Sequence, residues 1–440
     1  MPGVNPSNRR LRRANNLTEY GAASGGFGFG IPNGVGASYH AFRLFNRIKK
    51  ECCKEVPPLI PGWKIFDTLT IDANDTEFGK MIAMSEDGNF LAVIAQDTPS
   101  QMGTTNGKGS VHIFKLVGDS YTQVSTHYPS ANNMRIGASP NMSQIDISDD
   151  GHTVVYHEFD TNTSTGSGVV IRKNTNNDQF TQVHKLLSAN AGEEAEVAIS
   201  GDASRIAIAC PKEKEIDIYK LNAGNQQYAK EGGTLENNNN NIQDFGRSLA
   251  FNTDGSRLVV GTEEGPGLGG FYILGTTGAG GAWASVQEFL GTNAGHEFGK
   301  EVAISGNGEC IVVSLPTKNQ GAINVYKKDA NANTFTLETS INSTAGAGNQ
   351  YGMTLAISKD GSKIITSANR YDTPQNNNGM VVVYKKDGND YVVDDKILTG
   401  QTADEKFGGD VAISKDGKII AGSAPDFNND KGYVRVFKFH

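Results

Sequence analysis

The residue types that catalyse reactions are present in this chain of 440 residues, but they do not form any short catalytic motif. The eight histidines are scattered, with no His-Glu-x-x-His pair, and the four cysteines include no Cys-x-x-Cys pair. A Gly-x-Ser-x-Gly nucleophile elbow is also missing. Cys210 and Cys310 lie in apolar, strand-like segments and are expected to be buried free thiols. We therefore predict no catalytic residue, no cofactor and no metal.

A turn motif, Ser-x-Asp-Gly or a close variant, recurs seven times and defines the elements that must position any site. The intervals between successive copies are 52 to 63 residues. The copies begin at Ser85, Ser148, Ser200, Asn252, Ser305, Ser358 and Ser414. Repeats of about 40 to 50 residues with several strands each are typical of β-propeller blades. The 53 glycines agree with a chain of many tight turns.

Each repeat contains segments whose apolar residues alternate, which is the pattern of half-buried strands. The segment before each turn is the first strand, and in six repeats it has Ala two residues before the turn. A small residue suits an innermost strand, because the blades crowd together at the axis. Asp146 replaces this Ala in the second repeat, and we expect a polar contact or a water molecule to satisfy its carboxylate.

The fourth strand of a repeat begins with an aromatic residue, followed six or seven residues later by an apolar one, as in Tyr391 to Ile397. The last repeat has no such strand, because the chain ends after its third. Trp63 to Leu69 has the missing spacing and precedes the first repeat. We predict that it completes the last blade and so removes an exposed sheet edge. Residues 61–440 are thus predicted to be all-β, a closed seven-bladed β-propeller with four-stranded blades.

Five repeats open with an aromatic residue and glycine, about seven residues before the turn. The pairs are Phe78-Gly79, Phe245-Gly246, Phe298-Gly299, Tyr351-Gly352 and Phe407-Gly408. This pattern resembles the FG-GAP repeat of integrin-α-type propellers. The second and third repeats depart most, with Ile136-Gly137 displaced by five residues and Glu193-Glu194 where the pair is expected. The resemblance implies an adhesive propeller of extracellular type.

The resemblance also implies calcium bound by Asp-x-Asp-x-Asp-Gly loops, but the sequence departs from that pattern. The Ser-x-Asp-Gly turns lack the alternating carboxylates that calcium needs. Asp426, Asn428 and Asp430 have suitable spacing, but Gly432 follows one residue late. We favour a polar loop over a metal site there.

The first sixty residues differ from the rest in composition. They contain nine Lys or Arg and three acids, a net charge of +6, whereas residues 61–440 contain 31 basic and 45 acidic residues, a net charge of −14. Seven glycines lie between residues 21 and 36. We predict that residues 1–60 form an extended, basic, glycine-rich arm.

Within this arm, residues 38–54 are predicted to form a short basic amphipathic helix, because their apolar residues recur at spacings of three and four. Three interpretations stay open: packing on the chain's own propeller, docking to a protein partner, or contact with nucleic acid or an anionic membrane, the least favoured. The residues predicted to bind a partner are Arg9, Arg10, Arg12, Arg13, Phe42, Arg43, Phe45, Arg47 and Ile48.

From the missing catalytic motifs and the charge difference we predict a non-enzymatic scaffold. It would bind the other proteins of a large assembly through its arm and propeller loops, for example as a virion or capsid-associated component. The first alternative, from the resemblance, is a cell-surface adhesion or glycan-binding propeller. The second is an enzyme with a site at the mouth of the propeller channel, because propellers can build sites from one or two residues per blade.

The start of the chain is basic, but no apolar stretch follows, so a secretory signal peptide is not predicted. No apolar run approaches the ~18 residues that span a bilayer. We expect an intracellular or virion location rather than secretion.

Overall fold

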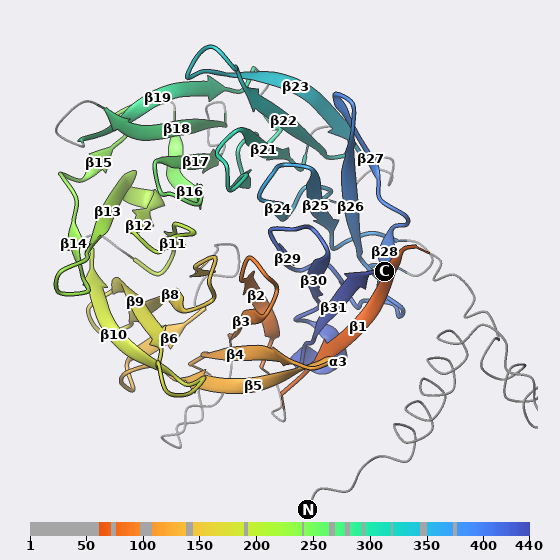
Figure 1. The fold of residues 1–440 in the computed structure, drawn as a ribbon, viewed down its shortest axis with the longest axis horizontal. Coiled ribbons are helices and arrows are strands. Elements are labelled where there is room, and N and C mark those ends of the chain that lie inside the picture. The colour runs from red at the N-terminus through yellow and green to blue at the C-terminus, as the bar shows by residue number, and fades with distance from the viewer. Residues whose placement is uncertain are drawn as a thin grey trace, which may run out of the picture. The chain divides into compact units, whose positions relative to one another are not determined.

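The computed structural model describes residues 61–440, except 72–75, 97–107, 138–143, 189–191, 240–241, 264–268, 278–281, 293–294, 318–319, 344–349 and 373–375. The described residues form seven antiparallel sheets arranged in a ring (Figure 1). The prediction of an all-β, seven-bladed propeller is confirmed. The arm and its predicted helix at 38–54 lie outside the described residues and stay predictions.

The strands of each blade follow one another from the axis to the rim of the ring. The first strands are β2 (Phe78–Met84), β6 and β7 (Met134–Ile136, Ile145–Ile147), β11 (Glu196–Ile199), β16 (Gln243–Phe251), β20 (Val302–Ile304), β24 (Leu355–Ile357) and β29 (Val411–Ile413). The second strands are β3 (Phe90–Ala95), β8 (Thr153–Asp160), β12 (Arg205–Cys210), β17 (Arg257–Glu263), β21 (Cys310–Leu315), β25 (Lys363–Ala368) and β30 (Ile419–Ser423). We number the blades 1 to 7 in this order.

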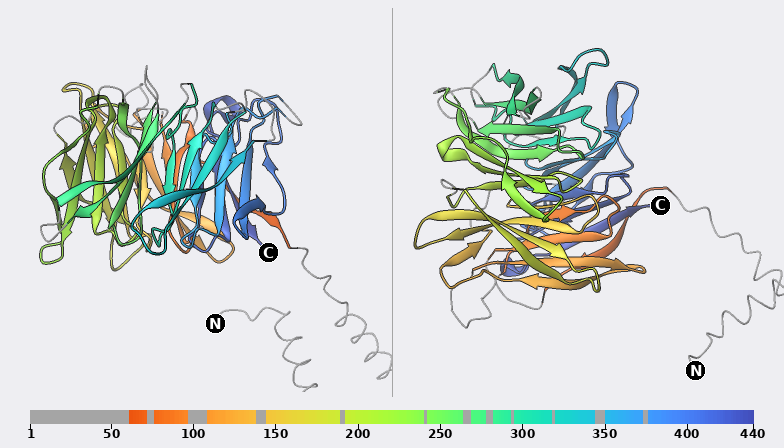
Figure 2. Two further views of the ribbon diagram at one scale, coloured as in Figure 1. Left: turned by 90° about the horizontal axis from the view of Figure 1, so that it is seen from above. Right: turned by 60° about the vertical axis from the view of Figure 1, so that its left-hand side comes forward.

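The two outer ranks complete the blades. The third strands are β4 (Ser110–Val117), β9 (Thr165–Lys173), β13 (Glu215–Asn222), β18 (Gly270–Thr277), β22 (Ala322–Lys328), β26 (Met380–Asp387) and β31 (Val434–Phe439). The fourth strands are β5 (Ser120–His127), β10 (Phe180–Leu187), β14 and β15 (Gln227–Lys230, Leu235–Glu236), β19 (Ala282–Leu290), β23 (Phe335–Asn342), β27 and β28 (Asp390–Val393, Leu398–Thr399) and β1 (Trp63–Leu69). Seen from the side, the strands cross the disc from face to face (Figure 2).

Helical structure in the described residues is confined to a 3-10 turn at Pro211–Glu213 and one short turn, α3 (Phe427–Asp430). Within these residues the structure has no helix of the length and apolar character that a membrane span requires.

The N-terminal strand closes the ring as predicted. β1 pairs antiparallel with β31, from Trp63 opposite Phe439 to Leu69 opposite Val434. Trp63 is 1% exposed, and its backbone N–H donates to the Asp395 carboxylate of blade 6 (3.0 Å). The closing strand therefore touches two blades.

One predicted strand position is wrong. In blade 6 the fourth strand breaks between Val393 and Leu398, so that Leu398 is buried and Ile397 is 39% exposed. Because of this break, the buried apolar residue is Leu398, seven residues after Tyr391. The same spacing of seven separates Tyr228 and Leu235 in blade 3.

The Ser-x-Asp-Gly turns meet around the axis and are joined by backbone hydrogen bonds into a closed ring, which we call the collar. Glu86 N donates to Asp149 O (2.9 Å), and Asp149 N donates to Gly201 O (2.8 Å). The series continues through Thr253, Gly306 and Lys359 to Lys415, whose N–H returns to Glu86 O (2.8 Å). The Asp side chain of a turn stabilises that same turn, since Asp87 accepts hydrogen bonds from Ser85 Oγ and Asn89 N.

The glycines of the five aromatic-glycine pairs have a conformational reason. All five have φ between +90° and +98°, which only glycine adopts without strain. A Cβ on Gly79 would lie 2.9 Å from Ser423 Cβ and 3.0 Å from Tyr433 O of the neighbouring blade. The preceding aromatic residue is also placed against that blade, as in the parallel bridge between Phe78 and Gly432. The pair therefore joins adjacent blades.

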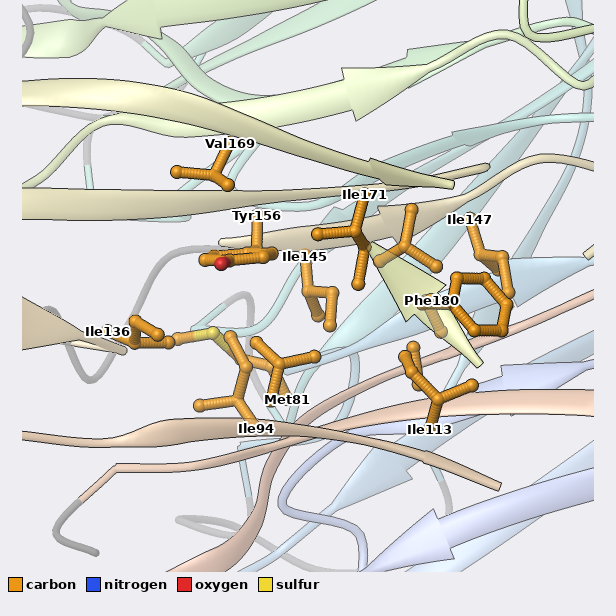
Figure 3. Close-up of a cluster of buried hydrophobic side chains, with 14 of the residues drawn as sticks. Met81, Ile94, Ile113, Ile136, Ile145, Ile147, Tyr156, Val169, Ile171 and Phe180 are labelled. Carbon is orange, nitrogen blue, oxygen red and sulfur yellow. The ribbon is translucent and has the colours of Figure 1, made fainter. Parts of the chain in front are cut away.

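The hydrophobic core consists of clusters between neighbouring blades rather than one central core. In the cluster between blades 1 and 2, Met81 and Ile94 from one sheet face Ile145 and Tyr156 from the next (Figure 3). Burial of these faces fixes the blades around the axis and leaves the innermost strands to line a channel.

Candidate functional site

A cavity of about 220 Å³ lies inside the ring, and its wall is formed by the innermost strands. These strands lie nearest the centre in Figure 1. Five of the six alanines two residues before the turns line this cavity, namely Ala83, Ala250, Ala303, Ala356 and Ala412. Their small side chains leave room along the axis.

Polar side chains line the cavity at one level, four residues before the turn. They come from four successive blades and are Ser248, Glu301, Thr354 and Asp410, which we call the polar sector. The equivalent residues of blades 1 to 3 are Met81, Gln144 and Glu196. Met81 lines the cavity but Gln144 and Glu196 do not, so the polar side chains that line the cavity at this level belong to blades 4 to 7.

Serines on the second strands support the polar sector from behind. Ser314 Oγ accepts a hydrogen bond from Glu301 N (2.9 Å), and Ser423 Oγ accepts one from Asp410 N (2.9 Å). Ser367 Oγ lies 2.8 Å from Thr354 Oγ1. The two backbone contacts fix the main chain at Glu301 and Asp410, the residues that carry the carboxyl groups.

The Asp410 carboxylate links two blades. Its Oδ1 accepts a hydrogen bond from Val411 N and its Oδ2 accepts one from Ile82 N of blade 1, both at 2.8 Å. Burial raises the pKa of Asp410 to about 7, against the opposing effect of these two N–H donors.

Glu301 is the second carboxyl group of the polar sector. Ser248 Oγ donates a hydrogen bond to Glu301 Oε2 (3.3 Å). The same Oγ accepts a hydrogen bond from Val302 N (3.2 Å). Burial raises the pKa of Glu301 to about 7, the nearby Arg247 charge lowers it, and the Asp410 charge raises it. Two interacting carboxyl groups that titrate near neutral pH thus face the same cavity.

Nearer the collar, Asp146 and a charged pair line the cavity. Asp146 accepts hydrogen bonds from Ile147 N (2.8 Å) and Ile199 N (2.9 Å), which confirms the predicted polar contact, and burial raises its pKa to about 6. Lys415 Nζ lies 3.7 Å from Asp149 Oδ1.

Side chains extend across the collar between blades that are not neighbours. Lys359 of blade 6 pairs with Glu86 of blade 1 at 2.7 Å. Asp149 of blade 2 pairs with Lys415 of blade 7 and accepts a hydrogen bond from Thr253 of blade 4 at 2.9 Å. These contacts connect opposite sides of the collar end of the cavity.

The geometry is suited to proton transfer. A carboxyl group with a pKa near 7 can donate a proton in one step and accept it in another at neutral pH. The charge of Asp410 raises the pKa of Glu301, so ionisation of Asp410 favours the protonated form of Glu301. The Glu301 and Asp410 pair can therefore act as general acid and general base.

The partner-binding residues predicted from the sequence, from Arg9 to Ile48, all lie outside the described residues, so the structure does not test them. In the last loop, Asp426 pairs with Lys406 (2.7 Å), while the Asp430 carbonyl accepts hydrogen bonds from Thr76 N and Glu77 N. Among the described residues, no three His, Cys, Asp or Glu side chains are grouped to hold a metal.

The sequence analysis missed Glu301 and Asp410. One signal could have found them: aligning the seven repeats on their turns places Ser248, Glu301, Thr354 and Asp410 in a single column, four residues before the turn. The same column also holds Gln144 and Glu196, which do not line the cavity, so the alignment would have narrowed the candidates to this column without selecting the pair.

No family model and no curated protein matches the chain. Several solved structures share its fold. A candidate 6-phosphogluconolactonase from Bacteroides uniformis is 14% identical, with 80% of this chain and 92% of that chain covered, at a TM-score of 0.55. Kuenenia stuttgartiensis hydrazine synthase is 13% identical, with 83% and 96% covered, at 0.53. A functionally unknown protein from Desulfotomaculum acetoxidans is 14% identical, with 77% and 94% covered, at 0.51. At such identities the similarity establishes the fold.

These comparisons correct one prediction. We expected a non-enzymatic scaffold, in one version a virion component, because short catalytic motifs are missing. Chains of this fold that are named as enzymes are among the similar structures, so that inference was wrong. The physical reason is that a propeller collects its site from one residue per blade, about fifty positions apart, so no local motif marks it.

Proposed function

We propose that this chain is an enzyme whose active site is the polar sector of the central channel. The observation that supports this most is the Glu301 and Asp410 pair: two interacting carboxyl groups on one cavity wall, each with a pKa raised to about 7 by burial. Such pairs of perturbed carboxyl groups are frequent at catalytic sites. The proposal is the second alternative of the sequence analysis.

The reaction class that fits the pair is hydrolysis of a small ester, and the name of the Bacteroides uniformis structure makes a sugar lactone the first substrate to test. The ionised carboxylate would take a proton from water as that water attacks the ester carbonyl. The protonated carboxyl group would give its proton to the departing ring oxygen. Water is consumed, the C–O bond of the ring breaks, and a hydroxy acid leaves.

The remaining residues of the polar sector would position the substrate. Thr354 and Ser248 present hydroxyl groups at the same level as the carboxyl pair. Arg247 is 5% exposed, and its positive charge lowers the pKa of Glu301. This effect favours the ionised form of Glu301 although its carboxyl group is buried.

The test is lactone hydrolysis by the wild type and by Glu301→Gln. Removal of a general acid or base is expected to lower kcat by about 100-fold or more. Glu158→Gln is the matched control, because Glu158 is also a buried carboxyl group, accepts hydrogen bonds from Ser130 N and Ser130 Oγ, and does not line the cavity. Equal losses in both variants, or no loss in Glu301→Gln with wild-type activity present, would exclude the assigned roles.

The finer family prediction is kept here as a proposal: we propose that the repeats are related to FG-GAP repeats. Five aromatic-glycine pairs in one backbone conformation support it. Its test is an alignment of homologues, in which these glycines should persist in all five repeats; their frequent replacement would contradict it.

A further inference from the structure

We infer that the channel site selects an uncharged, hydroxyl-rich substrate of single-sugar size and discriminates against its phosphorylated counterpart. This inference rests on the proposed function and names the substrate class of the same site. The experiment below separates its failure from the failure of that function.

The charges on the cavity wall disfavour an anion. Among the described residues that line the cavity, four are acidic, namely Asp146, Asp149, Glu301 and Asp410, and Lys415 is the one basic residue. Lys415 already pairs with Asp149. Arg247 does not line the cavity, and its charge lowers the pKa of Glu301.

Four backbone donors of the innermost strands are also occupied by the chain's own carboxylates. Innermost strands have N–H groups directed toward the axis, and such groups commonly bind phosphate. Here Ile82 N and Val411 N donate to Asp410, while Ile147 N and Ile199 N donate to Asp146. The chain's own carboxylates thus take the place that a ligand phosphate would need.

The size and remaining chemistry of the cavity fit a small polyol. A volume of about 220 Å³ is below the ~300–1,000 Å³ of sites for drug-sized ligands and equals the space of roughly seven water molecules. Carboxyl oxygens and the Ser248 and Thr354 hydroxyl groups can accept hydrogen bonds from ligand hydroxyl groups, which carry no charge.

The test compares an aldono-lactone with the same lactone phosphorylated at its terminal hydroxyl group, using the full chain. We expect kcat/KM to be about 100-fold higher for the uncharged lactone, the factor that one like-charge contact at ~6 Å produces at an effective dielectric of about 20. Equal values, or a preference for the phosphorylated lactone, would overturn the inference while leaving the proposed function standing.

A binding measurement keeps the inference testable if neither lactone is hydrolysed, an outcome that would exclude the proposed function. Calorimetric titration would use the uncharged lactam analogue of the lactone and its phosphorylated form. Tighter binding of the uncharged analogue, with a difference that shrinks about tenfold in Glu301→Gln, supports the inference. Tighter binding of the phosphorylated analogue, or binding of neither, overturns it.

Discussion

The raised pKa of Glu301 predicts that replacing it with Gln changes how stability depends on pH. The usual pKa of this carboxyl group is 4.5, and burial raises it to about 7 in the folded protein. Between these values the folded state binds more protons than the unfolded state. The free energy of unfolding of the wild type therefore falls as the pH rises from about 4.5 to about 7 and then levels off. Gln does not titrate, so Glu301→Gln lacks this loss.

The magnitude follows from the shift. Each pKa unit corresponds to about 1.4 kcal/mol, so the Gln variant should gain about 2 to 3 kcal/mol relative to the wild type between pH 5 and pH 8. Asp410 titrates in the same range and interacts with Glu301, so the measured change belongs to the pair. Effects of the substitution that do not depend on pH cancel in this comparison.

The assay is urea unfolding at several pH values, followed by the fluorescence of Trp63 and Trp283, which are both buried. Glu309→Gln in the same blade is the control, because Glu309 is exposed and its variant reports the loss of a surface carboxylate. A constant difference between Glu301→Gln and the wild type from pH 5 to pH 8 would refute the argument that Glu301 is held in a buried, proton-binding state.

Three further predictions concern the ring itself and use the same unfolding assay. Gly79→Ala should cost about 3 kcal/mol or more, because φ is +92° and the added Cβ meets Ser423, whereas Gly118→Ala, with φ of +66° and open space, should cost only about 1 kcal/mol; similar losses would contradict the role of neighbouring-blade contact. Ala203→Gly should raise stability by about 1 kcal/mol, since Ala203 has φ of +57° where the other turns have Gly; a loss would mean that its methyl contacts matter more. Trp63→Ala should cost about 3 to 5 kcal/mol by opening a cavity in the closing strand, while Ile65→Ala in the same strand, where Ile65 is 53% exposed, should cost little; equal effects would show that the ring does not depend on this anchor.

Much of the fold could be predicted because its determinants are local and repeated. In an aromatic-glycine pair such as Phe78-Gly79, the glycine occurs where the backbone takes a positive φ. The aromatic residue at Trp63, whose side chain is buried, marks the start of an outer strand. Ile397 shows the limit of such patterns. A break in the strand, which no periodicity reveals, moved the buried position to Leu398.

The candidate site could not be predicted in the same way. Glu301 and Asp410 are 109 positions apart in the sequence. Each lies in a repeat whose sequence otherwise resembles the other repeats, so nothing local distinguishes it. What makes them a pair is closure of the ring, which brings one residue from each innermost strand to a common cavity. Burial raises the pKa of both groups, and the Asp410 charge further raises the pKa of Glu301. Both effects depend on that closure.

The sequence by itself determined the number of blades, the strand that closes them and the turns at the collar, because alternation, turn chemistry and glycine conformation act over a few neighbouring residues. Only the tertiary structure decided that four blades present polar side chains to one cavity and that two carboxyl groups there interact. Electrostatic coupling depends on distance in space, and seven-fold closure sets that distance between residues far apart in the chain.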